Sequence, residues 1–101
     1  MHAEPTTWGL KLAVFYAELS RADDLLRLAK SQAAVGKLSG AVGTYAHLPP
    51  QVEAYVCRKL GIAPAPISTQ VVPRDGCAAF LCRLAIVGGM LERFATEIRH
   101  L

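Results

Sequence analysis

The 101-residue sequence has few charged side chains and few cysteines, and both shortages exclude whole classes of protein. Charged residues make up 19%, and the net charge of +3 comes from scattered Lys and Arg. A nucleic-acid surface would gather such residues on one face, so we expect no nucleic-acid partner. The cysteines Cys57, Cys77 and Cys82 show no CxxC spacing. A zinc site would use closely spaced thiolates, so we expect no bound metal and three buried thiols in a reducing cytoplasm.

The sequence also lacks a long uninterrupted apolar run. The longest, residues 77–91, contains Arg83 and falls short of the ~20 residues that cross a bilayer. The start MHAEPTTWG has no basic segment followed by an apolar core, which a secretory signal would need. We therefore expect a cytoplasmic protein with no membrane partner.

Apolar residues, in contrast, are abundant at 52%. A domain of ~100 residues that stands alone leaves a large share of its surface in water. We therefore expect that other chains or further segments cover the apolar faces of this short chain. We therefore interpret residues 1–101 as a single partial domain.

Apolar residues repeat at intervals of three and four in two long segments, which indicates helices over about 7–35 and 75–100. Thr7 is a candidate N-cap for the first of them. Pro49 and Pro50 open a shorter helix, about 50–60, which Gly61 ends. The fold class expected is all-α, with long antiparallel helices. The predicted apolar stripes are Leu12, Phe15, Leu19, Ala22, Leu26, Ala29 and Ala33 on the first helix, and Cys77, Phe80, Leu84, Val87, Leu91, Phe94, Ile98 and Leu101 on the last.

Two further features of the helices carry expectations about contacts. Glu18–Arg21 and Asp23–Arg27 have the spacing of ion pairs on a helix surface. Gly88 and Gly89 lie in the middle of the last helix, where each costs about 1 kcal/mol relative to Ala. Close approach of another helix would account for them.

Two loops, residues 36–49 and 61–74, separate the helices. The first begins GKLSGAVGT, which resembles a phosphate-binding loop only superficially, because its Lys follows the first glycine and the segment leaves a helix. The residues alone leave two interpretations open: a plain connector, or a loop that lines a ligand site.

Four stretches in the same order and spacing resemble the adenylosuccinate lyase family of the fumarase/argininosuccinase superfamily: HAEPTTWGLKLA, GKLSGAVGTYA, ISTQVVPRD and ERFATEIRHL. The resemblance covers essentially the whole chain. It implies the central helical bundle of a homotetramer, completed by other subunits or missing segments. It also implies a small-molecule nucleotide substrate, no cofactor, and β-elimination of fumarate from adenylosuccinate and succinylcarboxamide ribotide in purine biosynthesis.

The resemblance places the catalytic groups of the family outside this chain. The acid would be a histidine three positions before His2, and the base a serine on a loop further along. His2 itself matches the second, non-catalytic histidine of the motif. We therefore expect no catalytic residue among these 101 and no activity from the isolated chain.

The resemblance does carry substrate-binding residues onto this chain. Gln70 matches the family's substrate-binding glutamine, and its neighbours Ser68 and Thr69 are weaker candidates. Lys37 and Ser39 are expected at the rim of the active site. A side-chain amide offers one acceptor and two donors, which suits a substrate with carboxylate and amide-like groups.

The chain departs from the family pattern after Arg74-Asp75, where it continues with Gly76-Cys77 in place of Arg-His. We expect Asp75 to form a buried ion pair or to cap the last helix. Two alternatives to an adenylosuccinate lyase segment remain: another lyase or cycloisomerase of the superfamily, and a non-catalytic helical oligomerisation module.

Overall fold

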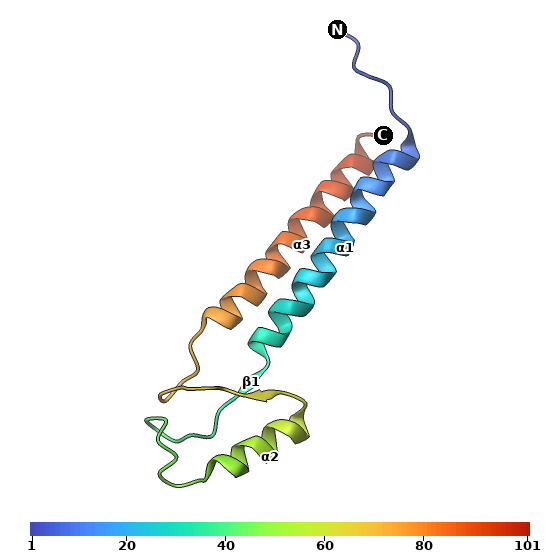
Figure 1. Cartoon of the computed structure of the whole chain (residues 1–101). Helices are drawn as coiled ribbons and strands as arrows, with labels where there is room; N and C mark the ends of the chain where they lie inside the picture. Colours follow the sequence, from blue (N-terminus) through green and yellow to red (C-terminus); the bar gives the residue numbers. More distant parts are fainter.

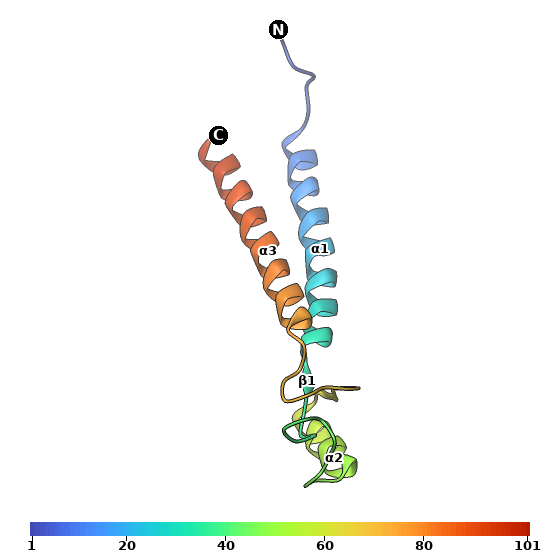
Figure 2. The same ribbon diagram turned by 90° about the vertical axis from the view of Figure 1, so that its left-hand side faces the viewer.

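The computed structural model describes residues 1–101 as two long helices with a small unit at one end (Figure 1). The elements in order are α1 (Trp8–Ala33), β1 (Val35–Gly36), α2 (Pro50–Leu60), β2 (Ala63–Pro64) and α3 (Asp75–Arg99). Helices α1 and α3 run antiparallel, and α2 lies beyond β1 at the end away from both termini (Figures 1 and 2). The all-α fold class is confirmed, since the strands have two residues each.

Three of the four predicted helix ends follow from local chemistry. The Thr7 hydroxyl accepts a hydrogen bond from the Leu10 N–H at 3.1 Å, which satisfies one of the free donors of the first turn of α1. Pro50 opens α2, and Gly61 closes it with a left-handed φ of 70°.

The expectation for Asp75 is wrong. Arg74 occupies the cap position of α3, no side chain caps the helix, and Asp75 is its exposed first residue with no ion pair to Arg74. A residue already inside the first turn cannot accept a bond as a cap does. Its negative charge instead lies beside the positive end of the helix dipole.

The contact between α1 and α3 is aromatic and charged near the termini and made of smaller side chains further along. The Phe15 and Phe94 rings lie 4.7 Å apart, and the Arg93 guanidinium lies 4.9 Å from the centroid of the Phe15 ring. Arg93 also pairs with Glu18 across the helices. The predicted Glu18–Arg21 pair is therefore not formed, whereas Asp23 and Arg27 do pair at 2.8 Å.

A second ion pair, Lys11–Glu97, joins α1 and α3 near the chain ends. Further along, Ala22 and Ala29 of α1 and Met90 of α3 are buried.

The predicted stripe of α3 is only partly covered by α1. Val87 and Phe94 are half-buried, but Leu84 is 42% exposed and Leu91 and Ile98 are each 52% exposed. The contact is rotated towards Met90, because α1 packs along one side of the stripe only. The other side of α3 has no covering element in this chain.

The molecule is elongated, with principal dimensions of 72 × 21 × 19 Å and a radius of gyration of 21.1 Å. A compact domain of this length would have about 13 Å. Only seven of 101 residues are buried. A Cβ added at Gly88 or Gly89 would meet no atom within 4 Å, so the helix expected close to these glycines is not α1.

The cysteines correct another expectation. Cys57 is buried in α2, but Cys77 and Cys82 are exposed on α3. None of the three helices combines the length and the apolar character that spanning a bilayer requires.

Strands β1 and β2 attach the small unit to the helical pair. They pair in parallel, with Val35 opposite Ala63 and Gly36 opposite Pro64. The Ala65 N–H donates to the Gly36 carbonyl at 2.8 Å. This pairing, which the sequence did not predict, places the loop that follows β1 beside the loop that follows β2.

Candidate functional site

The glycine-rich loop after β1 is a closed turn with unusual backbone angles. The Tyr45 N–H donates to the Ser39 carbonyl at 2.9 Å and closes it. Gly40 and Gly43 have φ values of 87° and 80°, and Tyr45 has a φ of 54°. Such angles are easy for glycine and unfavourable for a bulky residue. Tyr45 is therefore held in place by contacts of its own.

Those contacts come from a buried carboxylate on α2. Glu53 is 3% exposed. It accepts from the Leu38 N–H at 2.6 Å and from the Tyr45 hydroxyl at 2.8 Å. One carboxylate therefore binds the loop where the chain enters it and where the chain leaves it.

The hydrogen bond to Glu53 also changes the chemistry of the phenol. Because the carboxylate accepts the phenolic proton and would repel a phenolate, it raises the pKa of Tyr45 above its usual value, and burial acts in the same direction. The raised pKa keeps the Tyr45 phenol protonated, and so a donor to Glu53, further into the alkaline range than an ordinary tyrosine.

The two loops, residues 36–49 and 61–74, meet at Ser39 and Ser68. Ser39 is 2% exposed, and its hydroxyl lies 3.1 Å from the Ser68 hydroxyl. Nearby, a Cβ added at Gly43 would fall 1.8 Å from the Ser68 carbonyl oxygen. Only a glycine allows the two backbones to approach so closely.

The structure brings some of the predicted site residues together and leaves others apart. Ser39 and Ser68 are in contact, and the Lys37 ammonium donates to the Gly40 carbonyl within its own loop. Thr69 and Gln70 are exposed, and neither side chain is hydrogen-bonded within the chain. The amide of Gln70 is thus available for a ligand or another chain.

Glu53 and Tyr45 were missed by the sequence analysis. A signal existed for Glu53, because it lies four residues before Cys57 and so on the same face of α2. Glu53 and Cys57 are the buried residues of α2. A charged residue on the buried face of a short helix indicates a buried polar partner.

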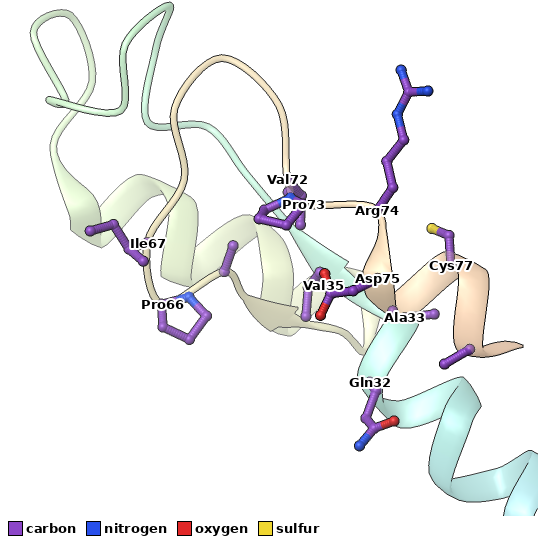
Figure 3. Close-up of a pocket in the computed structure, with 13 residues that line it drawn as sticks. Gln32, Ala33, Val35, Pro66, Ile67, Val72, Pro73, Arg74, Asp75 and Cys77 are labelled. Carbon is purple, nitrogen blue, oxygen red and sulfur yellow. The ribbon is translucent and has the colours of Figure 1, made fainter.

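A cavity of about 610 Å³ lies beside this site rather than in it. Its walls come from the end of α1, Val35, residues 65–67 and 72–74, and the start of α3. None of the five predicted site residues lines it. Figure 3 shows the Arg74 side chain extending away from the cavity and Asp75 directed towards Val35. No group of three or more His, Cys, Asp or Glu side chains could hold a metal ion.

The two loops of this helical chain present an amide and hydroxyls. Similarity to known proteins defines the class of protein to which the chain belongs. The chain belongs to the Lyase family, whose pattern it matches over residues 1–101. Two curated relatives are adenylosuccinate lyases. That of Bacillus subtilis (strain 168) is 52% identical and that of Staphylococcus saprophyticus 48% identical, each over 101 residues.

These matches confirm the resemblance to the adenylosuccinate lyase family. Each covers 100% of this chain, so the four sequence stretches that carried the resemblance belong to one continuous similarity. The chain spans 23% of the length of these relatives.

Proposed function

We propose that this chain is the part of an adenylosuccinate lyase that forms one wall of the active site. The reaction is the β-elimination of fumarate from adenylosuccinate and from succinylcarboxamide ribotide, in purine biosynthesis, by a cytoplasmic homotetramer. The observation that carries the proposal is the match of the whole chain, at 52% and 48% identity, to two enzymes of that name.

The chemistry assigns a binding role to this chain. In the elimination a base removes a proton next to a carboxylate, and an acid protonates the departing nitrogen. Both groups come from polypeptide outside these residues. The Gln70 amide can donate to a substrate carboxylate and accept from an N–H at once. Its exposure and its lack of partners in the chain support this role.

The other predicted site residues shape the wall. Ser68 and Thr69 present hydroxyls next to Gln70, although the Ser68 hydroxyl is already engaged by Ser39. Lys37 is held by the Gly40 carbonyl and contributes positive charge to the rim. Ser39 braces the rim from a buried position.

A hybrid enzyme tests the proposal. The matching segment of the Bacillus subtilis lyase is replaced by this chain, and fumarate release from adenylosuccinate is followed by absorbance. We expect kcat/KM within about tenfold of the parent, which is about 1.4 kcal/mol of transition-state stabilisation. The isolated chain should release no fumarate. A folded hybrid without turnover would overturn the proposal.

Two variants of the hybrid separate binding from folding. Removing a hydrogen bond to a charged substrate group costs about 1.5–3 kcal/mol, so Gln70→Ala should lower kcat/KM by about 10-fold to 100-fold. The matched control is Gln51→Ala, an exposed glutamine on α2, which should leave kcat/KM unchanged.

A second candidate function is a non-catalytic helical oligomerisation module. The observation that favours it is the exposed apolar side of α3, which includes Leu84, Leu91 and Ile98. The hybrid distinguishes the two. A hybrid that assembles as the parent does but has no turnover would support the module.

A further inference from the structure

Glu53 is a buried carboxylate without a cation beside it. It is 3% exposed, forms no salt bridge, and both of its donors, the Leu38 N–H and the Tyr45 hydroxyl, are neutral. Burying a charge under such conditions costs free energy that an apolar side chain of similar size would not. The role of Glu53 therefore lies in the geometry that it imposes rather than in stability.

The geometry of its two hydrogen bonds is specific. The oxygen Oε2 accepts from Leu38, where the chain enters the loop, and Oε1 accepts from Tyr45, where it leaves. The Ser39–Tyr45 backbone bond closes the same turn. One side chain on a helix thus holds both ends of a loop that a backbone hydrogen bond closes.

The loop in turn fixes the segment that carries the predicted substrate contacts. Ser39 follows Leu38 directly, and its hydroxyl contacts that of Ser68 at 3.1 Å. Gly43, within the same turn, lies against the Ser68 carbonyl. Ser68 is two residues before Gln70, so a shift of the loop would be passed to the Gln70 amide.

We propose that Glu53 is a positioning residue that holds residues 38–45 against Ser68 and thereby sets the place of Gln70 in the substrate site. This inference rests on the proposed function for its kinetic readout, and only on the structure for its dynamic one. Glu53 does not touch substrate, and acts through Ser39 and Ser68.

The test uses the hybrid enzyme with four variants: Glu53→Ala, Glu53→Gln, Ser39→Ala and the exposed control Gln51→Ala. Glutamine can accept from Leu38 with its carbonyl and donate to the Tyr45 oxygen with its amide. Glu53→Gln should therefore keep kcat/KM within about threefold of the unmodified hybrid. Glu53→Ala should lower kcat/KM by about tenfold or more, mainly through KM. The reason is that a misplacement of substrate-positioning groups by about 1 Å can lower catalytic efficiency by about 10²-fold.

Amide exchange supplies the readout that does not depend on activity. Glu53→Ala should speed exchange in residues 38–45 and in 68–70, whereas Ser39→Ala should speed it in 68–70 only. Equal exchange in both loops for Glu53→Ala and Gln51→Ala would overturn the proposal. So would a Glu53→Ala enzyme with an unchanged KM, or a Glu53→Gln enzyme as impaired as Glu53→Ala.

The outcomes also separate this inference from the proposed function. An unmodified hybrid that is folded but inactive overturns the function, and the exchange pattern still decides the role of Glu53. An active hybrid in which Glu53→Ala behaves as Gln51→Ala does overturns the positioning role alone.

Discussion

The hydroxyl oxygens of Ser39 and Ser68 lie 3.1 Å apart, and theirs is the side-chain hydrogen bond that joins the two loops of the candidate site. The serines are 29 residues apart in the chain. The parallel pairing of β1 with β2 brings their loops together.

Removing either serine hydroxyl should destabilise the part of the chain between α1 and α3, which contains β1, α2 and β2. A buried hydrogen bond contributes about 1 kcal/mol, so we expect Ser39→Ala to lower the free energy of unfolding by about that amount, measured by denaturant titration. Because the two hydroxyls share one bond, the double variant with Ser68→Ala should cost less than the sum of the single variants. Ser20→Ala, at an exposed position of α1, is the control, and strict additivity would contradict the contact.

Gly43 and Gly40 form a matched pair of glycines. Both have positive φ, 80° and 87°, but only a Cβ at Gly43 would meet backbone, at 1.8 Å from the Ser68 carbonyl oxygen. Alanine in this region costs about 1–2 kcal/mol from its own backbone. We expect Gly40→Ala to cost that much and Gly43→Ala clearly more, with faster amide exchange at residues 68–70. Equal losses in unfolding free energy would show that the loops do not touch there.

The Tyr45 phenol should give stability a dependence on alkaline pH. Its pKa is raised in the folded chain by the bond to Glu53, whereas in the unfolded chain it is about 10. Above that value the folded chain keeps a proton that the unfolded chain has lost, so unfolding becomes easier as pH rises. The full contribution is present below about pH 10 and disappears as pH passes the folded pKa.

The measurement is a denaturant titration at several alkaline pH values. Tyr45→Phe should remove this part of the pH dependence, and Tyr16→Phe, at a 77% exposed position, should retain it. An unchanged pH profile in Tyr45→Phe would contradict the role of the Glu53 bond.

The exposed apolar side of α3 should drive association of the isolated chain. Light scattering is expected to show dimers, tetramers or larger species, because burial of apolar surface contributes roughly 25 cal/mol per Å². Leu84→Gln with Leu91→Gln, at positions 42% and 52% exposed, should shift the chain towards monomer with its helical content retained.

The control for association is a pair of exposed leucines outside the two long helices, Leu48→Gln with Leu60→Gln. This pair should leave the association unchanged. A monomeric parent chain at high concentration would contradict the prediction.

The sequence by itself determined the helices and the family. Periodic apolar residues, Thr7 as a cap, and the Pro50 and Gly61 signals act within one or two turns of chain, so local physics suffices to read them. The same holds for the Asp23–Arg27 pair, whose members are four residues apart on one helix.

Only the tertiary structure decided what lies across the chain. The side of α3 that α1 covers depends on how the helices are rotated about their axes. The apolar stripe does not fix this rotation, because it extends to both sides of the contact. Glu18 pairs with Arg93 rather than with Arg21 for the same reason. Glu53 meets Leu38 and Tyr45, and Ser39 meets Ser68, only because a two-residue strand pair joins segments distant in sequence. So short a pairing has no periodicity of its own, and its register is set by contacts that no local pattern contains.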